Sequence, residues 1–446
     1  MDISFLLDIF EEHAAADAMA CQDTVIKYSS LGSLIDEYRE YLKSELVARG
    51  SVVALKADFS PEAVALLLVL AEADCIVVPL TASVEALSEE LMKIAEAEYV
   101  IVVNKDEGVT CTATNRVADH ELLVELRSRM HPGLILFTSG SSGVRKAVVH
   151  DFSALFEKFR ARRVTKRTLT FFLFDHIGGI DTLFHTLSNG GCVITTPDRQ
   201  VDSICQTVEL HKVEVLPVSP TFINLMLLSG VYHNYDLSSL QIVTYGTEVM
   251  SQQTLDGLCR AIPHVRVLQK YGLSEVGALR SKSESNDSCW VKLGGEGVEL
   301  RVVDGLLEIK SKSQMLGYMN SPSPFTDDGW FMTGDAVEVK GEYFHILGRQ
   351  SEQINVGGEK FFPAESEAVL QEIDGVIDVS VTARANPLTG NTVVATFCLE
   401  KEEPLSGFRI RMRAFCKNKL PSYMVPQKVL LQTSPLHSER YKKIRR

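Results

Sequence analysis

Apolar and polar positions along the first half of the chain predict strands and helices in alternation. Short apolar runs, such as Tyr99-Val100-Ile101-Val102-Val103, have the length and composition of buried strands. The segments between them repeat apolar residues at helical spacing, and proline opens the one that starts at Pro61. Buried strands that alternate with helices build a mostly parallel sheet flanked by helices. The predicted elements are helices over 5–18, 31–49, 61–72 and 84–95, strands over 52–55, 75–80 and 99–103, and an exposed turn region over 108–115.

A second doubly wound unit and two smaller units are predicted from residue 153 onward. Strands and helices alternate as far as Tyr245, whereas turn signals such as Asp327-Asp328-Gly329 predict hairpins between Gly294 and Ile346. The predicted fold class is α/β, with a large N-terminal domain of doubly wound sheets over 1–349, a small β-barrel-like subdomain within it at about 294–349, and a small mobile α+β C-terminal domain over 350–446. The predicted elements here are helices over 153–162, 201–210, 222–228, 364–372 and 407–419 and strands over 193–194, 213–218, 240–245, 376–382 and 392–399.

The composition narrows the classes of function. A formal net charge of −13 opposes a general role in binding nucleic acid, because a phosphate backbone is bound by an excess of Lys and Arg. The nine cysteines are scattered and lack Cys-x-x-Cys spacing, which indicates reduced thiols. The N-terminus has no basic stretch typical of a signal peptide, and no apolar run reaches the ~18 residues that a membrane span needs. We expect a cytoplasmic protein without a membrane span.

One stretch has the composition of a phosphate-binding loop. It lies between two strand-like runs and reads Thr138-Ser139-Gly140-Ser141-Ser142-Gly143-Val144-Arg145-Lys146. Its glycines let the backbone turn sharply, and its hydroxyls and the Lys146 ammonium are donors for anionic oxygens. It is not a Walker loop, because the Gly-x-x-x-x-Gly-Lys spacing is absent and no helix start follows. A solvated Ser/Gly loop between two strands is the alternative.

Three later fragments carry side chains suited to a nucleotide. Tyr271-Gly272-Leu273-Ser274-Glu275 offers an aromatic face for a base and a carboxylate for a divalent cation. Thr333-Gly334-Asp335 offers a carboxylate for ribose hydroxyls, and Gly348-Arg349 offers a fixed positive charge. Each fragment alone could be a turn, a cap or a solvated face. Together with the loop, and in this order, they indicate a nucleotide site.

With these motifs, the chain resembles the acyl-adenylate-forming superfamily, which contains acyl- and aryl-CoA synthetases, luciferases and adenylation domains of peptide synthetases. The resemblance covers the chain from Leu134 onward, although Arg145 and Ala147 stand where the family's loop usually has proline and glycine. It implies a site for ATP with Mg²⁺, the metal being held by Glu275. For the phosphates it implies Thr138, Ser139, Gly140, Ser141, Ser142, Gly143 and Lys146, and for adenine it implies Gly246, Thr247 and Glu248, which follow Tyr245. The other residues that it implies for the nucleotide are Tyr271, Gly272 and Ser274 of the next motif, Asp335 for the ribose, and Arg349, just before the hinge.

The same resemblance implies a hinge and a thiol tunnel near the start of the small domain. The hinge falls on Ser351, where the family usually has Asp or Lys, and serine cannot anchor either conformer by charge. The tunnel segment falls on Gly357, Gly358 and Glu359. Through it the thiol of coenzyme A, or of carrier-protein pantetheine, would reach the site.

An acid pocket is implied around a His-Ile-Gly-Gly pattern that is similar to that of CoA ligases. His176 would lie at its carboxylate end, although a histidine that only caps a helix is the alternative. Asp175 after Phe174 leaves a second reading open, in which the aspartate pairs with the α-ammonium of an amino acid. The side chains implied for the pocket suit an aryl or modest acyl group, and they are Phe174, Asp175, His176, Ser219, Phe222, Tyr245, Gly277 and Ala278, of which Phe222 taken alone is more typical of a core.

The C-terminal segment departs from the family's terminal motif, Pro-x-Thr-x-x-Gly-Lys followed by an aliphatic and then a basic residue. Counting from Ser438 as the threonine puts the catalytic lysine at Lys442. Matching the ending Lys443-Ile444-Arg445-Arg446 puts it at Lys443, which is the preferred register. A basic, solvated tail without a catalytic role is the third possibility.

The predicted function is that of an ATP-dependent acid–thiol ligase, an acyl- or aryl-CoA synthetase. A carboxylic acid and ATP would give acyl-AMP and pyrophosphate, and CoA would then take the acyl group, with the lysine, Glu275 and His176 as catalytic residues. One alternative is a free-standing adenylation enzyme that loads an aryl or amino acid onto a separate carrier protein. The other is a catalytically silent adenylate-binding protein, which the irregular C-terminal motif favours. The acid and the oligomeric state stay open.

Overall fold

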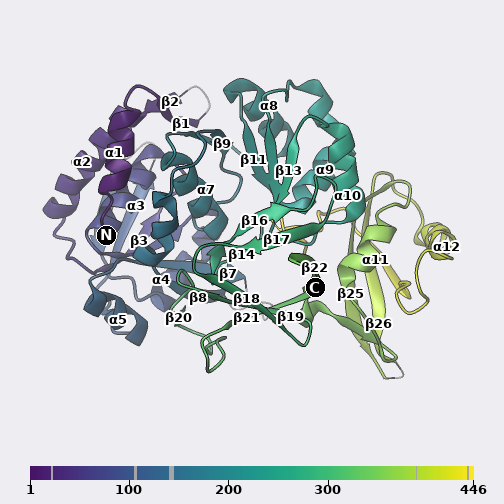
Figure 1. Ribbon diagram of the computed structural model, residues 1–446. Helices are drawn as coiled ribbons and strands as arrows, with labels where there is room; N and C mark the ends of the chain where they lie inside the picture. Colours follow the sequence, from purple (N-terminus) through teal and green to yellow (C-terminus); the bar gives the residue numbers. More distant parts are fainter. Residues whose placement is uncertain (22–23, 105–107, 140–144, 388, 439–440, 446) are drawn as a thin grey trace.

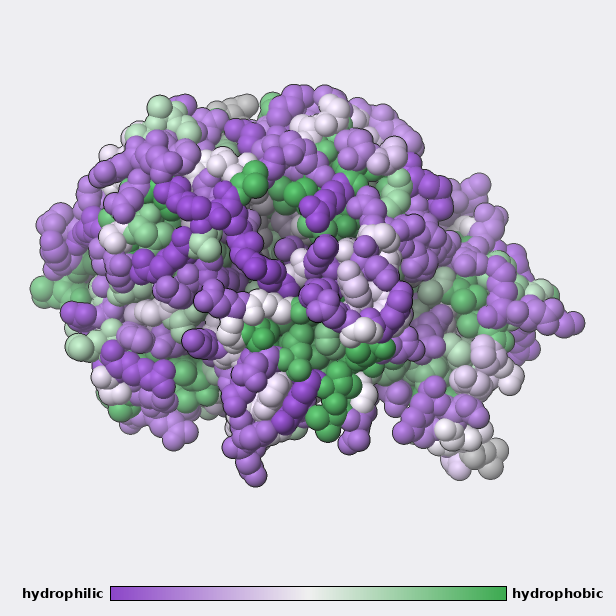
Figure 2. Space-filling view, viewed as in Figure 1, coloured by the Kyte–Doolittle hydropathy of each residue, from purple (hydrophilic) through white to green (hydrophobic). Residues whose placement is uncertain are grey.

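Two seven-stranded sheets form the large part of the protein in the computed structural model, which describes residues 1–21, 24–104, 108–139, 145–387, 389–438 and 441–445. Figure 1 shows helices around both sheets, antiparallel strands in the lower centre, and the C-terminal unit at the right. The surface in Figure 2 is mostly hydrophilic and is hollowed between the segments that Figure 1 labels α7 and β11.

The first sheet carries the predicted phosphate segment. Strand β4, at the centre of the sheet, pairs in parallel with β3 and β7, and β3 pairs in parallel with β5, whereas β7 and β8 are antiparallel. Strands β3 and β4 are buried almost throughout, as their continuous Val, Ile and Leu runs predict. In spatial order the strands are β20 (Gly317–Tyr318), β8 (Arg145–Asp151), β7 (Gly133–Ser139), β4 (Ile76–Leu80), β3 (Val52–Lys56), β5 (Tyr99–Asn104) and β6 (Gly108–Ala113).

The second sheet is parallel except at one edge, where β2 runs antiparallel to β1. Helices connect its parallel strands, so the residues that follow each strand gather at one edge, where open α/β sheets bind ligands. In spatial order the strands are β13 (Arg266–Gln269), β12 (Ile242–Tyr245), β11 (Val215–Val218), β9 (Arg167–Leu169), β10 (Cys192–Thr195), β1 (Asp17–Cys21) and β2 (Thr24–Lys27). The helices are α7 (Ile177–Leu187), α8 (Val201–His211), α9 (Pro220–Ser229) and α10 (Gln252–Ala261), with the short helix η3 (Val231–Asn234).

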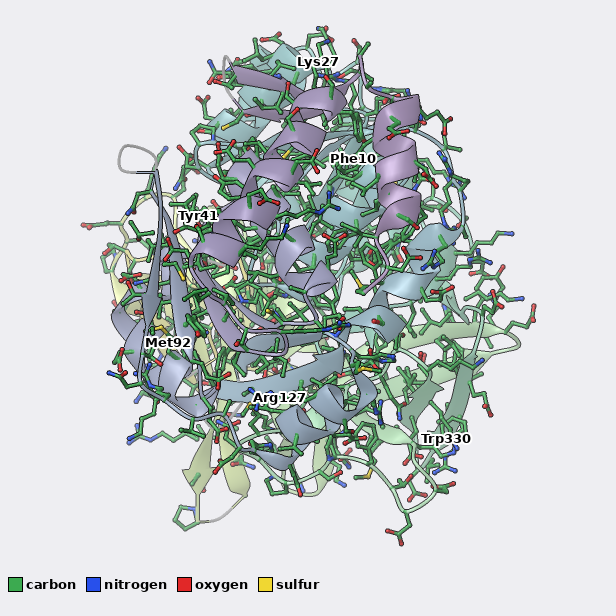
Figure 3. The ribbon with its side chains drawn as sticks, turned by 90° about the vertical axis from the view of Figure 1, so that its left-hand side faces the viewer. Phe10, Lys27, Tyr41, Met92, Arg127 and Trp330 are labelled. Carbon is green, nitrogen blue, oxygen red and sulfur yellow. The ribbon has the colours of Figure 1, made fainter. Side chains whose placement is uncertain are left out.

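Helix α3 (Pro61–Glu72) is the centre of the largest core. Ser60 caps it by accepting a hydrogen bond from the Ala63 amide at 3.1 Å, and all residues from Ala63 to Ala71 are buried, so the helix is apolar on every side. Helix α2 (Tyr28–Ser44) packs on α3, and α1 (Ser4–Glu12) packs on α2. Figure 3, which labels Phe10 and Tyr41, shows α1 and α2 side by side. The other helices of this half are η1 (Ala82–Leu87), α4 (Ser88–Ile94), α5 (Glu121–Arg129), α6 (Phe152–Phe156) and η2 (Glu157–Arg160).

A six-stranded antiparallel sheet leads from the large part into the C-terminal unit. Its strands in spatial order are β16 (Arg280–Ser283), β17 (Trp290–Gly294), β22 (Tyr343–Arg349), β21 (Phe331–Lys340), β19 (Leu306–Ser311) and β18 (Val298–Val303), with the small hairpin β14 (Gly272–Leu273) and β15 (Gly277–Ala278) before it. The C-terminal unit has its own core around Phe397 and Phe408. Its elements are η4 (Gln350–Glu352), β23 (Ile354–Val356), β24 (Glu359–Phe361), α11 (Pro363–Leu370), β25 (Val376–Asn386), β26 (Gly390–Leu399), α12 (Leu405–Cys416) and β27 (Lys428–Leu431).

This mixed α/β arrangement confirms the predicted fold class, and two element predictions are wrong. The helix predicted over 5–18 ends at Glu12, and Asp17–Cys21 is strand β1, because pairing with β10 and β2 overrides the helix propensity of its alanines. The predicted turn region over 108–115 contains the edge strand β6, antiparallel to β5. No helix in the described part of the chain is long and apolar enough to cross a membrane.

Alanine substitutions at two helical glycines should change the stability of the protein in opposite directions. A methyl group on Gly32 in α2 would meet no atom within 4 Å, so Gly32→Ala should raise the free energy of unfolding by about 0.5–1 kcal/mol. A methyl group on Gly179 in α7 would overlap the Leu173 carbonyl oxygen, so Gly179→Ala should lower it by about 1–3 kcal/mol. Chemical denaturation followed by circular dichroism measures both, and shifts in the same direction would contradict this packing.

Candidate active site

Both ends of the predicted phosphate segment are held by the pairing of β7 with β8. Thr138 lies opposite Lys146, and Ser139 lies opposite Arg145. The five residues 140–144 at the centre of the predicted segment lie outside the described part of the chain, and they include the predicted site residues Gly140, Ser141, Ser142 and Gly143.

Strand β20 and the residues directly after it bring two polar side chains, Tyr318 and Asn320, to this hairpin. The Asn320 side chain accepts a hydrogen bond from the Ala147 amide at 2.9 Å and donates one to the Arg145 carbonyl at 2.8 Å, which fixes the start of β8. The Tyr318 ring lies under the Lys146 ammonium, with 4.7 Å between the nitrogen and the ring centroid. The Tyr318 hydroxyl donates to Glu275 Oε1 at 2.7 Å. Tyr318 therefore joins the predicted phosphate lysine to the predicted metal ligand.

Asp335 lies in a second buried polar cluster close to Glu275. The Tyr271 hydroxyl donates to Asp335 Oδ2 at 2.6 Å, and Arg349, opposite Asp335 across β21 and β22, places Nε 3.3 Å from Oδ1. Burial raises the pKa of Asp335, Arg349 opposes this shift, and the charge of Glu275 adds to it. The structure thus brings Lys146, Glu275, Asp335 and Arg349 together, and the roles that the sequence analysis gives them stay predictions.

The segment between Tyr271 and Glu275 is shaped by close backbone contacts. The His150 imidazole donates from Nε2 to the Ser274 carbonyl at 2.6 Å, and burial lowers the pKa of His150, which favours the neutral ring. Gly272 pairs with Ala278, and a β-carbon on Gly272 would lie 2.8 Å from the Ala278 Cα. Only glycine fits at this position.

The predicted adenine segment follows the end of β12. Tyr245 is buried and its hydroxyl donates to Gln269 Oε1 at 3.3 Å. A β-carbon on Gly246 would lie 2.7 Å from the Lys270 carbonyl oxygen, and Thr247 has φ of +73°, which is uncommon outside glycine. Glu248 accepts from the Thr221 hydroxyl at 2.6 Å and from the Lys443 amide at 2.6 Å, so it links the large part to the C-terminal segment.

His176 caps α7 and faces a small space shared with Lys442. Its Nδ1 accepts from the Gly178 amide at 3.0 Å, so the neutral ring carries its proton on Nε2. The ring stacks on Phe172 with 5.4 Å between centroids. A small, partly open space of about 10 Å³, about the size of one water molecule, is lined by Phe172, Leu173, His176, Arg199 and Lys442. His176 can therefore cap α7 and still face the space that Lys442 lines.

The remaining predicted pocket residues are mostly buried in the core. Phe174 is fully buried against Phe59, and Phe222 is fully buried against Phe171. Asp175, which follows Phe174 in the sequence, is also buried. Ser219 caps α9 by accepting from the Phe222 amide at 3.2 Å. The hairpin residues Gly277 and Ala278 belong to β15, which contacts α7.

Of the two candidate lysines, the structure places Lys442 beside His176. Tyr441, the residue before it, has φ of +52°, a conformation that favours glycine, and this is where the motif counted from Ser438 has its glycine. The Lys442 amide also donates to Ser438 Oγ at 3.4 Å. This geometry favours Lys442 over the preferred register at Lys443.

Lys443 lies instead in a buried ionic cluster of the C-terminal unit. Its Nζ donates to the Val379 carbonyl at 2.7 Å and lies 3.3 Å from Asp378 Oδ1 and 3.7 Å from Glu367 Oε2, while Arg445 binds Glu367 at 2.8 Å. Burial alone would lower the pKa of Lys443, but Glu367 and Asp378 raise it above its ordinary value. Burial alone would raise the pKa of Glu367, but Lys443 and Arg445 lower it.

The predicted hinge and thiol-tunnel residues lie in the C-terminal unit. Ser351 belongs to the exposed short helix η4. Gly357, Gly358 and Glu359 are exposed at the β23–β24 turn, where the two glycines have φ of +64° and +96°.

Three residues of this site were not predicted: Tyr318, Asn320 and His150. The strand around His150 and the Gly-Tyr-x-Asn stretch that ends at Asn320 are visible in the sequence, but their hydrogen-bond partners lie 43 to 175 residues away in the chain. These contacts depend on the tertiary fold, in which β20 pairs with β8. Within the described ranges, no group of three or more His, Cys, Asp or Glu side chains has the arrangement of a metal site.

Known proteins match this chain over most of its length. The AMP-binding enzyme family matches residues 9–318, and the AMP-binding enzyme C-terminal domain matches residues 365–440. Similar relatives include an indoleacetate–CoA ligase of Aromatoleum aromaticum, 23% identical over 91% of this chain and 89% of its own, and a 2-succinylbenzoate–CoA ligase of Listeria monocytogenes, 26% identical over 76% and 75%. Similar solved structures include the anthranilate CoA ligase AuaEII in complex with anthranoyl-AMP, with a TM-score of 0.82, 18% identity and coverage of 98% and 95%.

The chain belongs to the AMP-binding enzyme family. This confirms the predicted membership of the acyl-adenylate-forming superfamily and, with it, the predicted enzyme class of AMP-forming acid–thiol ligases.

The stability contributed by Glu367 should depend on pH in the acid range. Because its folded-state pKa lies below the ordinary 4.5, its carboxylate stabilises the fold above about pH 4.5, and this contribution is lost as the pH falls through the folded-state pKa. Glu367→Gln should lower the free energy of unfolding by about 3 kcal/mol at neutral pH. It should also weaken the dependence of this free energy on pH in the acid range.

Thermal unfolding of the full chain at a series of pH values measures this effect. Glu372→Gln is the control, since Glu372 forms a partly exposed pair with Lys419 and should change stability by less than about 1 kcal/mol. Unchanged stability of Glu367→Gln at neutral pH would contradict the assigned role of the ionic cluster.

Proposed function

We propose that this protein activates an aryl carboxylic acid as its acyl-AMP and transfers the acyl group to CoA. The observation that carries the proposal is the convergence of Lys146, Glu275, Asp335 and Arg349, together with the position of Lys442 beside His176. Relatives and similar structures named for indoleacetate, 2-succinylbenzoate and anthranilate support an aryl acid and a CoA acceptor.

In the first step an oxygen of the acid attacks the α-phosphorus of ATP. A new O–P bond forms, the bond to the leaving pyrophosphate breaks, and pyrophosphate takes the electron pair. Since two anions must meet, fixed positive charges and hydrogen-bond donors have to offset the charge. Lys146 and the hydroxyls between Thr138 and Lys146 bind the phosphates. Asp335 accepts hydrogen bonds from the ribose, and Arg349 offsets the charge of Asp335.

Lys442 and His176 position the acid. The Nε2 proton of His176 is donated to a carboxylate oxygen, and the Lys442 ammonium bridges that oxygen and the α-phosphate as a positioning charge. Gly246 and Tyr271 lie on the adenine side, where Gly246 permits close approach of the base.

The residues present fit a Mg²⁺ ion that enters with ATP. Glu275 is a buried carboxylate next to the phosphate segment, and Mg²⁺ is usually held by one or two carboxylates together with substrate phosphates. The ion would offset the charge of the leaving pyrophosphate. A preformed cage of several protein ligands is not needed for this role.

In the second step the CoA sulfur attacks the acyl carbon, the bond between acyl carbon and AMP oxygen breaks, and the thiol proton leaves to solvent. The domain of residues 350–446 turns about Ser351 against the large domain of residues 1–349, whose β-rich subdomain spans about 294–349. This turn withdraws Lys442 and brings Gly357 to Glu359 to the acyl group. The exposure of that segment in this conformation is consistent with such a turn.

Alanine variants of Lys442 and Lys443 should affect the two half-reactions differently. Lys442→Ala should lower acid-dependent ATP–pyrophosphate exchange by roughly 100-fold or more, because the bridging charge is lost, while thioester formation from supplied acyl-AMP stays near the wild-type rate. Lys443→Ala, the comparison variant, should affect both half-reactions to a similar extent through the ionic cluster. Selective loss of exchange in Lys443→Ala alone would move the catalytic role to Lys443.

The exposed turn of the C-terminal unit should affect only thiolysis. Glu359→Trp adds bulk without disturbing the positive φ of the two glycines before it, so it should slow thiolysis several-fold and leave pyrophosphate exchange unchanged. Single-turnover assays with an aryl-AMP and CoA measure the step. Equal loss of exchange would show damage to the fold instead of a blocked tunnel.

A further inference from the structure

Tyr441 of the C-terminal segment is inserted into the large part of the molecule. Its side chain is 6% exposed and packs with the Phe171 and Phe222 rings, at centroid distances of 5.4 and 5.7 Å. Its hydroxyl donates to the Arg199 carbonyl at 2.5 Å. The Phe171 and Phe222 rings and the Arg199 carbonyl together hold the Tyr441 side chain, and we call these three residues the aromatic socket. The His437 ring, from the same segment, stacks on the Tyr441 ring with 4.9 Å between centroids.

The residue on the other side of Lys442 is also fixed to the large part. The Lys443 amide donates to Glu248 at 2.6 Å, and Glu248 is held in turn by the Thr221 hydroxyl. Both neighbours of Lys442 are therefore tied to the large part, one by an aromatic ring and one by a backbone hydrogen bond. These contacts fix the direction in which the Lys442 side chain leaves the backbone, toward the space that His176 also lines.

Tyr441 has a left-handed backbone conformation, which is unusual for a tyrosine. A φ of +52° is strained for a tyrosine and unstrained for glycine, so the conformation is retained only because the surrounding contacts stabilise it. Buried aromatic side chains contribute strongly to contacts between packed units. The socket contacts outweigh this strain.

We propose that Tyr441 is a positioning residue that docks the C-terminal segment in the aromatic socket and so sets Lys442 beside His176. This inference rests on the proposed function, in which Lys442 acts in the first half-reaction. Docking favours the adenylation arrangement, and the ring has to leave the socket before the second half-reaction. Since Ser351 offers no charge to hold either arrangement, the socket supplies the preference.

Three variants test the proposal. Tyr441→Gly removes the ring and relieves the strain, and Tyr441→Phe keeps the ring and removes the hydroxyl. Ile444→Gly, at a side chain that is 37% exposed, is the matched control for loss of bulk in the same segment. Circular dichroism and thermal unfolding of each variant confirm that the chain is folded.

The first measurements need no enzymatic activity. In Tyr441→Gly, hydrogen exchange at the Lys443 amide and the rate of Lys442 modification by an amine-reactive reagent should each rise by roughly tenfold or more, whereas Ile444→Gly should match the wild type. Unchanged exchange and unchanged Lys442 modification in Tyr441→Gly would overturn the proposal. These readouts stay valid even if the wild type activates no acid, so failure of the proposed function is seen separately, as absence of pyrophosphate exchange.

The kinetic measurement separates positioning from a purely structural role. Tyr441→Gly should lower the kcat of pyrophosphate exchange by roughly 10- to 100-fold with little change in the KM for ATP, and thiolysis of supplied acyl-AMP should be unchanged or faster. Tyr441→Phe should recover exchange to within about fivefold of the wild type. Equal loss of both half-reactions in Tyr441→Gly would overturn the proposal.

Discussion

The site depends on the burial of two carboxylates, Glu275 and Asp335, close to each other. Like charges in a low-dielectric interior repel, so each carboxylate needs partners that offset or share its charge. Tyr318 and Tyr271 donate hydroxyl hydrogen bonds to them, and Arg349 supplies one positive charge. The Lys146 ammonium over the Tyr318 ring supplies a second. In the proposed complex, the divalent cation that enters with the nucleotide would add positive charge beside Glu275, and the ribose hydroxyls would bind Asp335.

The C-terminal segment contacts both the large part and the C-terminal unit. Residues 441 to 445 contain a ring buried in the aromatic socket, a backbone hydrogen bond to Glu248, and two cations in the ionic cluster of the C-terminal unit. Lys442 lies between these anchors and is directed to His176. In our proposal the irregular motif has a physical role, because Tyr441, which stands where the family's motif has glycine, holds the lysine in place.

Much of the fold and part of the site could be predicted from the sequence. Continuous apolar strands and the capped, proline-opened helix α3 are local signals, and the order of motifs from Thr138 to Arg349 indicates the family. Contacts between distant segments could not be predicted. Strand β1 depends on pairing with β10, and Tyr318 gains its role only where β20 meets β8. The choice between Lys442 and Lys443 depends on the left-handed backbone at Tyr441, which no local preference of tyrosine indicates.

A crystal structure with an aryl-sulfamoyl adenosine, a stable mimic of an acyl-AMP, tests the central claim most directly. The prediction is that the ribose hydroxyls bind Asp335, the adenine lies beside Gly246 and Tyr271, and the sulfamoyl group lies between Lys442 and His176. The claim would be contradicted if the mimic bound in another place, such as the cavity of about 270 Å³ that Glu248, Gln371 and Lys443 help to line between the large part and the C-terminal unit.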